Sequence, residues 1–117
     1  MNPWKIPYKT TCFNCKKNVN QIVEIYLNQA FVKCENCGAT RYYILRNTYI
    51  DEGNIIEEEK NRKSKYEPWL LETEIKCFNC EKKCIQDILI TEYGLFVRCK
   101  CCKFTRHYMF HMINISK

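Results

Sequence analysis

The chain has 117 residues, ten of them cysteine, and a formal net charge of +6. This length allows one ordinary domain or two very small ones, and a unit of about 40 residues needs a disulfide, a metal or a partner to fold. No stretch approaches the roughly 18 to 20 continuous apolar residues of a membrane span, so we expect no membrane protein. The N-terminal residues show no apolar signal-peptide core, and we therefore expect an intracellular, reducing compartment, the cytoplasm or nucleus, where thiols bind metal.

The sequence aligns with itself without a gap at an offset of 65 residues, so that residues 3–45 match residues 68–110. A Pro-Trp pair and a Cys-Phe-Asn-Cys motif recur at the same separation, and identical residues continue as far as Tyr43 and Tyr108. Matches of this density without gaps indicate a duplication with one shared backbone. We therefore predict two domains, residues 1–45 and 68–117, joined by a charged linker over residues 46–67.

Each copy carries the pattern C-x2-C-x18-C-x2-C. Two C-x2-C turns can bring four thiolates to one tetrahedral site, which suits Zn²⁺ or a single iron ion, and the 18-residue spacer is typical of paired zinc sites. We predict two Zn²⁺ ions, one for each copy, and disulfides are the alternative. The predicted ligands are Cys12, Cys15, Cys34 and Cys37 in the first copy and Cys77, Cys80, Cys99 and Cys102 in the second.

The Pro-Trp pair before the first cysteine of each copy predicts the anchor of a lead-in strand. Trp4 and Trp69 are expected to pack across the small sheet and enlarge its core. A role of these two rings in recognising a partner is the alternative.

The spacer between the cysteine pairs has the alternating, β-branched character of a hairpin. In the first copy we expect a strand over residues 19–27, a return strand into Cys34 and a third strand over residues 40–45. The second copy repeats this pattern. A three-stranded antiparallel sheet pinned by a four-cysteine site resembles the zinc-ribbon superfamily, over nearly all of both copies. The resemblance implies a small, metal-stabilised all-β fold made of two tandem three-stranded ribbons.

The linker carries an acidic run followed by a basic run. Asn54 is placed to cap a short helix that continues to about residue 66, with Glu57 at the capping-box position and Pro68 beyond its end. Its apolar support is sparse, so we expect the helix to form by docking on a ribbon. A solvated linker is the alternative.

The net charge predicts an anionic partner, although each four-thiolate zinc site contributes about −2 and reduces the total to about +2. Lysines crowd the cysteine turns and neutralise the thiolates in one interpretation. Basic and aromatic residues that recur on two strands of each copy predict a face that stacks bases and pairs phosphates. These residues are Lys33, Arg41, Tyr43, Arg98, Arg106 and Tyr108. A protein interface is one alternative, and a place in the core is another for the two tyrosines.

Cys84 and Cys101 lie outside the repeated pattern, and we expect both to be buried thiols. Cys101 precedes Cys102 directly, so it could replace a ligand if the second site shifts its register. His107 and His111 are four residues apart, but the repeat places His107 on a strand, which argues against a helical metal site.

Signals of catalysis are thin, and we predict that the protein is not an enzyme. The chain has no phosphate-binding glycine loop, no HExxH and no nucleophile–base pair. Within the zinc-ribbon superfamily, transcript-cleavage factors carry an Asp-Glu pair at the hairpin tip. The corresponding tips here, residues 27–30 and 91–94, lack that pair.

The layout of two ribbons is similar to that of the ninth-subunit type of RNA polymerase component, without that family's Gln/Arg/Asp-Glu segment. The resemblance implies a partner that is nucleic acid or a nucleic-acid-processing protein complex. The second hypothesis is a protein–protein adaptor or inhibitor, viral or encoded by a mobile element, that uses a composite surface of both ribbons. A rubredoxin-like electron carrier is a third, because residues 34–38 (CENCG) are similar to an iron-binding turn.

Overall fold

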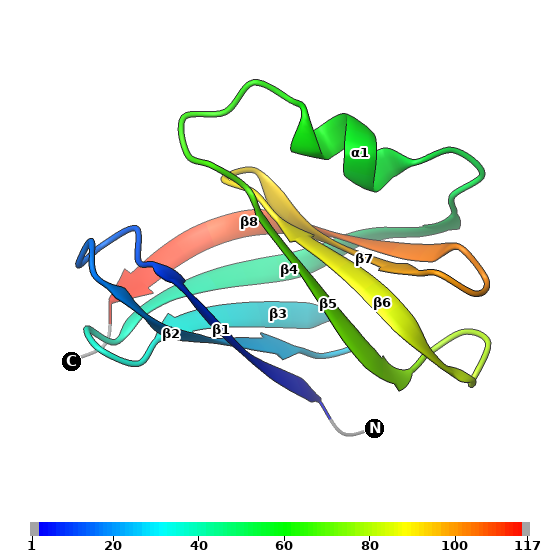
Figure 1. The fold of residues 1–117 in the computed structure, drawn as a ribbon, viewed down its shortest axis with the longest axis horizontal. Helices are drawn as coiled ribbons and strands as arrows, with labels where there is room; N and C mark the ends of the chain where they lie inside the picture. Colours follow the sequence, from blue (N-terminus) through cyan, green and yellow to red (C-terminus); the bar gives the residue numbers. More distant parts are fainter. Residues whose placement is uncertain (1–2, 116–117) are drawn as a thin grey trace. The chain divides into compact units, whose positions relative to one another are not determined.

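The computed structural model describes residues 3–115, which form eight β-strands and one short helix (Figure 1). The first copy contains β1 (Trp4–Thr11), β2 (Asn18–Ile25), β3 (Gln29–Cys34) and β4 (Ala39–Ile50). Helix α1 (Ile55–Lys60) follows, and the second copy contains β5 (Trp69–Lys76), β6 (Lys83–Ile90), β7 (Gly94–Cys99) and β8 (Phe104–Ile115). Every strand of the second copy begins and ends 65 residues after its counterpart, which confirms that the two copies share one backbone.

The prediction of three-stranded ribbons is wrong, because each copy contributes four strands. The lead-in segment pairs with β2 along its whole length, from Trp4 opposite Ile25 to Thr11 opposite Asn18. Trp4 is only 4% exposed, so its ring fixes this extra strand to the sheet. The last strand is also longer than predicted, with 12 residues in each copy, since the β-favouring pattern continues past residue 45.

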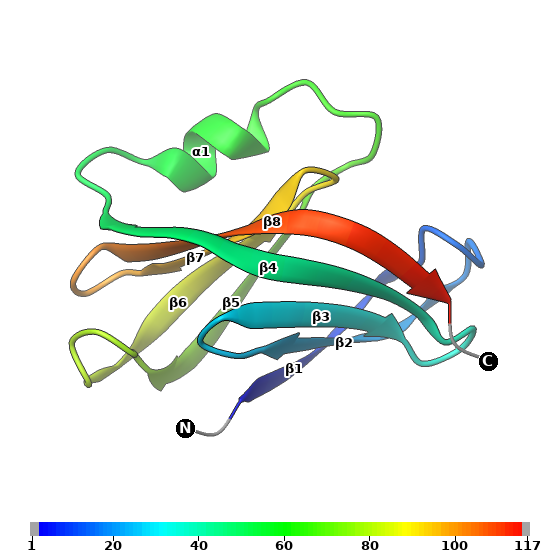
Figure 2. The ribbon, with the colours of Figure 1, turned by 180° about the vertical axis from the view of Figure 1, so that it is seen from behind.

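The chain divides into two compact units, and the neighbouring strands β1 to β4 of the first copy can be followed in Figure 2. Unit 1 comprises residues 1–45 and 110–117, and unit 2 comprises residues 46–109. In unit 1 the strand order is β1-β2-β3-β4 followed by the C-terminal part of β8. In unit 2 the order is β5-β6-β7, then the N-terminal part of β8 and the end of β4. The strand pairs within each copy are antiparallel.

Alternation along the strands gives each unit one apolar face, which we call its inner face. In unit 1 a row of directly opposed residues runs from Trp4 through Ile25 and Ala30 to Tyr43, all buried. In unit 2 the row of equivalent positions runs from Trp69 through Ile90 and Leu95 to Tyr108, where only Trp69 is partly exposed. The repeated tyrosines are therefore core residues in both units.

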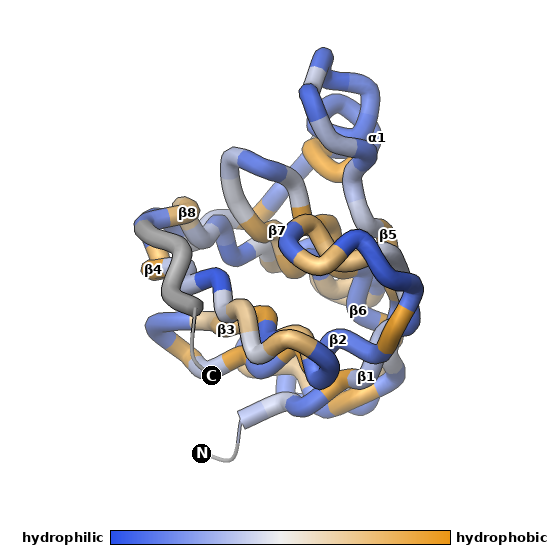
Figure 3. Tube along the Cα trace, turned by 90° about the vertical axis from the view of Figure 1, so that its left-hand side faces the viewer, coloured by the Kyte–Doolittle hydropathy of each residue, from blue (hydrophilic) through white to orange (hydrophobic). Residues whose placement is uncertain are grey.

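Helix α1 begins where the sequence predicts and ends earlier, at Lys60 rather than near residue 66. The Asn54 side chain accepts a hydrogen bond from the Glu57 backbone N–H at 3.4 Å. Ile56 packs against Leu89 and Phe96 of unit 2, so the apolar side of α1 lies toward the sheet (Figure 3). The helix is far shorter than a membrane span, and no other helix occurs in residues 3–115.

We expect Gly94→Ala to lower the free energy of unfolding by about 1–3 kcal/mol, because a Cβ at this position would lie 2.6 Å from the carbonyl oxygen of Tyr108. Gly53→Ala is the matched control, since the nearest atom to its Cβ, an Asp51 carboxylate oxygen, lies at an ordinary 3.7 Å. Urea unfolding of the two variants measures the difference. Equal stabilities would contradict the tight contact between β7 and β8.

Candidate metal centres

Each C-x2-C pair occupies a tight turn, here called a knuckle, and the residue after its second cysteine closes the turn. The four closing residues have left-handed backbones, with φ of 62° at Lys16, 78° at Gly38, 61° at Glu81 and 65° at Lys103. Their N–H groups donate to the carbonyl of the first cysteine of the knuckle over 2.9–3.2 Å. Three of the four are not glycine, at a cost of about 1–2 kcal/mol each. The closing residues of the knuckles therefore adopt a backbone conformation that three of the four do not favour by themselves.

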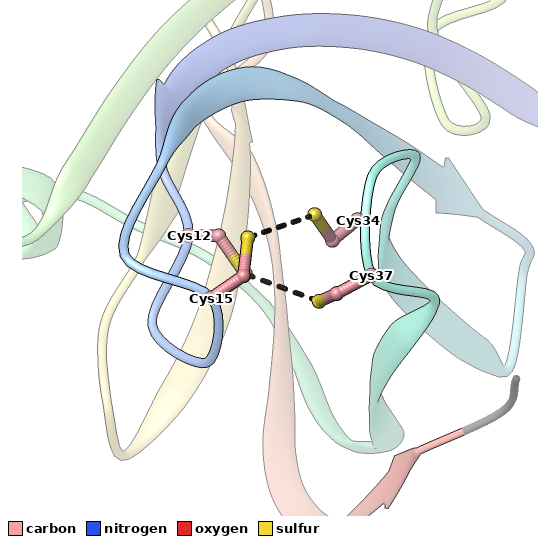
Figure 4. Close-up of side chains that lie close together, drawn as sticks. All are labelled: Cys12, Cys15, Cys34 and Cys37. Atoms are coloured by element: carbon pink, nitrogen blue, oxygen red, sulfur yellow. Dashed lines mark hydrogen bonds between the residues drawn. The ribbon is translucent and has the colours of Figure 1, made fainter.

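The knuckles bring the eight predicted ligands into two clusters, one in each unit. In unit 1 the sulfur atoms of Cys12 and Cys37 are 3.8 Å apart and those of Cys15 and Cys34 are 3.9 Å apart (Figure 4). In unit 2 the corresponding distances are 3.7 Å and 4.0 Å. A tetrahedral zinc site with Zn–S bonds of about 2.3 Å has sulfur atoms about 3.8 Å apart. The clusters therefore fit a tetrahedral metal ion.

Asparagine side chains complete the surroundings of the sulfur atoms. Asn14 donates through its backbone N–H to Cys12 at 3.3 Å and through its side-chain amide to Cys37 at 3.4 Å. In unit 2 Asn79 repeats both contacts, at 3.3 Å and 3.6 Å. Donors of this kind stabilise thiolates, the form that binds metal.

The thiols of each cluster differ in acidity. Burial raises the pKa of Cys12 to about 11 and that of Cys77 to about 12. The Asn14 hydrogen bond lowers the pKa of Cys37 to about 6. For Cys102, hydrogen bonds from Asn79 and from the backbone outweigh the effect of burial and lower the pKa to about 7. The thiols of Cys37 and Cys102 are thus the more easily deprotonated, and binding of a metal ion would have to displace the proton of the buried cysteine.

Four cysteines per cluster decide what the sites can do chemically. A metal ion with four protein ligands keeps no open position for water or substrate, which is the arrangement of a structural site. Two clusters that could hold metal ions are therefore present, and a donor set of four thiolates suits zinc or a single iron ion.

The repeated arginines lie beside the clusters and not on the surface. The Arg41 guanidinium lies 5.1 Å from the centre of the Phe13 ring, and that of Arg106 lies 3.9 Å from the Phe78 ring. Arg106 is 2% exposed and donates from Nη1 to the Tyr108 hydroxyl at 2.6 Å. Burial lowers the pKa of Arg106 to about 10, so it remains a cation at neutral pH. This buried cation interacts electrostatically with Cys77 and offsets part of the negative charge that the thiolates of the second cluster would carry.

The structure does not bring the six predicted partner-binding residues onto one exposed face. Val32 lies opposite Arg41 and Lys33 opposite Thr40, so Lys33 and Arg41 project from opposite faces of the sheet in unit 1. The same register separates Arg98 from Arg106 in unit 2. Of the six residues, only Lys33 is exposed. The sequence shows which residues are equivalent in the two copies, but the register of the strands decides on which face of the sheet each residue lies.

Arg98 has a structural partner in the linker. Its Nε lies 3.1 Å from the Asp51 carboxylate, and its Nη2 donates to the carbonyl of Gly53 at 3.0 Å. The Asp51 carboxylate also accepts from the N–H groups of Gly53 and Ile55, at 3.1 Å and 2.9 Å. This largely buried ion pair fixes the start of α1 to β7.

Cys84 and Cys101 form a disulfide with a Cα–Cα distance of 6.2 Å, and Cys101 is exposed. The expectation of two buried thiols is therefore wrong. The sulfur of Cys99 lies within 4.8 Å of both disulfide sulfurs, so the disulfide adjoins the second cluster without supplying a ligand to the four-cysteine set.

Phe13, Asn14 and their counterparts Phe78 and Asn79 are functional residues that ligand spacing alone does not identify. The signal was present in the sequence, since Cys-Phe-Asn-Cys recurs without change in the first knuckle of each copy. In each motif the phenylalanine ring contacts the arginine guanidinium, and the asparagine amide donates a hydrogen bond to a cysteine sulfur.

Comparison with known proteins shows a relative that extends over the whole chain. The chain is 59% identical over 117 residues to the uncharacterized protein MJ1158 of Methanocaldococcus jannaschii, which covers 100% of this chain and 91% of that protein. No family model matches the sequence, and no solved structure matches it.

We expect Cys37→Ser to reduce the bound metal from two ions per chain to one, because serine replaces a ligand of the first cluster. The double variant Cys84→Ser/Cys101→Ser is the control and should keep both ions. Elemental analysis of protein purified without added metal gives the ratio. Loss of an ion in the double variant would assign a ligand role to Cys101.

We expect Arg106→Met to destabilise the metal-loaded protein by about 2 kcal/mol, because it removes a desolvated cation from the Phe78 ring and from the thiolates. Arg62→Met is the control, since Arg62 stacks on Tyr93 at an exposed site and should contribute less than about 1 kcal/mol. Urea unfolding distinguishes the two. Unchanged stability in Arg106→Met would show that this buried cation does not stabilise the second cluster.

Proposed function

We propose that this chain, which belongs to the same family as the Methanocaldococcus jannaschii protein MJ1158, is a nucleic-acid-binding protein and not an enzyme. In this proposal two structural zinc ions stabilise its small β fold. The zinc assignment rests on the clusters, and the partner rests on the distribution of charge.

Zinc is favoured by sulfur–sulfur distances of 3.7–4.0 Å in both clusters and by the asparagine donors at their rims. Four thiolates also suit a single iron ion, the centre of an electron carrier. Metal analysis and the colour of the purified protein separate the two ions, because zinc has no redox chemistry and no visible absorption.

The observation that carries the nucleic-acid proposal is the concentration of positive charge in unit 1. Residues 1–45 contain six Lys/Arg against two Glu, a net +4, whereas unit 2 contains twelve Lys/Arg against eleven Asp/Glu, a net +1. Five of the six basic residues of the first segment are exposed. With about −2 for each zinc site, residues 1–45 stay positive and unit 2 becomes slightly negative. A polyanion is the partner that such a charge favours.

A protein partner is the second candidate, and it is favoured by exposed apolar side chains. Leu27 is 53% exposed and Ile44 is 39% exposed, both in unit 1. Purification of the tagged protein from its own cells, with and without nuclease, separates the candidates. Partners that remain after nuclease treatment favour an adaptor, and nucleic acid recovered only without nuclease favours direct binding.

We expect the zinc-loaded protein to bind mixed-sequence nucleic acid, with an association constant that falls as salt rises. Contact of about three phosphates with lysines gives a slope of about −2 in a plot of log K against log salt. Fluorescence anisotropy measures the slope, and protein treated with a chelator should not bind, since small metal-stabilised domains unfold without metal. Absence of binding to any nucleic acid at low salt would contradict the proposal.

A further inference from the structure

The face of unit 1 opposite its core differs in character from the inner face. We call it the outer face of unit 1 and define it by the register of the strands. One row of opposed residues runs Lys5, Glu24, Phe31, Tyr42, and the next runs Pro7, Ile22, Lys33, Thr40; Lys9 and Asn20 follow beyond them. Its side chains are all exposed or half-buried.

Aromatic rings form a continuous ladder on this face. Phe31 and Tyr42 are stacked, with ring centroids 5.0 Å apart and planes 23° apart. Tyr26 meets Phe31 edge-on at 6.0 Å, and His111 of β8 meets Tyr42 edge-on at 6.2 Å. With β8 included, the outer face reaches across five strands, which is about 19 Å at the usual strand spacing.

The charge of the outer face is positive. Lys5, Lys9 and Lys33 are exposed on it. Its single acidic residue, Glu24, accepts a hydrogen bond from the Tyr26 hydroxyl. The face therefore offers three separate cations around a line of aromatic rings.

The duplication supplies an internal comparison, because unit 2 has the same face with other residues. Phe96 and His107 repeat the stacked pair, with centroids 4.4 Å apart, but Ile55 and Ile56 of α1 pack over Phe96. Among the described residues of unit 1, 3–45 and 110–115, no helix covers the equivalent pair.

The charges of the two outer faces also differ at equivalent positions. Lys9 corresponds to Glu74, Pro7 to Glu72, and Ile22 to Asp87. In unit 2 the Lys100 ammonium lies 3.0 Å from the Glu72 carboxylate and 3.7 Å from that of Asp87. Carboxylates repel phosphates, so the outer face of unit 2 is unsuited to nucleic acid for reasons of charge as well as cover.

We propose that the outer face of unit 1 binds a single strand of nucleic acid, with bases against the aromatic ladder and phosphates on Lys5, Lys9 and Lys33. This inference rests on the proposed function and adds the site and the form of the ligand. Aromatic rings stack on bases only where the bases are unpaired, which favours a single strand over a duplex. Stacking is tolerant of sequence, so RNA and DNA of any composition bind. One strand binds per chain, because α1 and the carboxylates close the equivalent face of unit 2.

The first test replaces a cation by its counterpart in the other copy. Lys9→Glu introduces the residue that unit 2 carries at the same exposed position, so the fold should tolerate it. Anisotropy with a labelled single strand of about 12 nucleotides should show weaker binding and a salt slope shallower by about 0.7 or more. Lys63→Glu, an exposed charge reversal in unit 2, is the matched control and should change affinity less than Lys9→Glu. Equal losses in the two variants would overturn the proposal, because they would indicate a response to net charge alone.

The second test removes a ring. Tyr42→Ala should weaken binding about 5-fold to 150-fold and leave the salt slope unchanged, since a stacking contact is worth about 1–3 kcal/mol. Tyr93→Ala removes an exposed ring of unit 2 and should have no effect. If Tyr42→Ala does not fold, Lys9→Glu still tests the binding site, because it leaves the aromatic ladder intact.

Further outcomes bear on the same site. A duplex that competes as well as the single strand, or a stoichiometry of two strands per chain, would overturn the proposal. Binding that survives both Lys9→Glu and Tyr42→Ala would place the nucleic acid elsewhere and leave the proposed function standing. If the unaltered protein binds no nucleic acid at all, the proposed function itself fails, and the outer face becomes a candidate surface for an acidic protein partner.

Discussion

The convergence of four sulfur atoms in each unit governs the backbone, the charge and the packing around it. Two knuckles must face each other at sulfur–sulfur distances near 3.8 Å. This fixes the open end of the hairpin between them, where its first strand begins and its second strand ends. It also requires left-handed backbone at the closing residues, including Lys16 and Lys103. The apolar surface that a copy of about 40 residues buries contributes too little free energy to stabilise these strained backbones by itself. A bound metal ion would supply the missing free energy.

The concentrated negative charge of the thiolates accounts for the strongest repeats outside the cysteines. Asparagine amides reach the sulfur atoms, and arginines are buried against the phenylalanines of the first knuckles. Arg41 and Arg106, which the sequence suggested for a binding face, therefore belong to the surroundings of the candidate metal sites. Lys5, Lys9 and Lys33, by contrast, are exposed on the outer face of unit 1.

The two copies differ more on the outer face of the sheet than on the inner face. On the inner face, Tyr43 and Tyr108 are identical and pack in equivalent cores. On the outer face, Glu74 occupies the position of Lys9, and α1, held by the Asp51–Arg98 ion pair, covers Phe96. Outward positions experience no packing constraint from the metal site, so the two copies were free to diverge in charge and in cover.

The duplication, the eight cysteines of the two clusters, the strands between them and the start of α1 could all be predicted from the residues, because spacing, period-2 alternation and capping are local properties. The projection of Lys33 and Arg41 from opposite faces could not be predicted in this way, since strand register follows from the hairpin and the knuckles together. The pairing of Cys84 with Cys101 also appears only in the folded chain. These features depend on contacts between segments distant in the chain, and no local pattern encodes them.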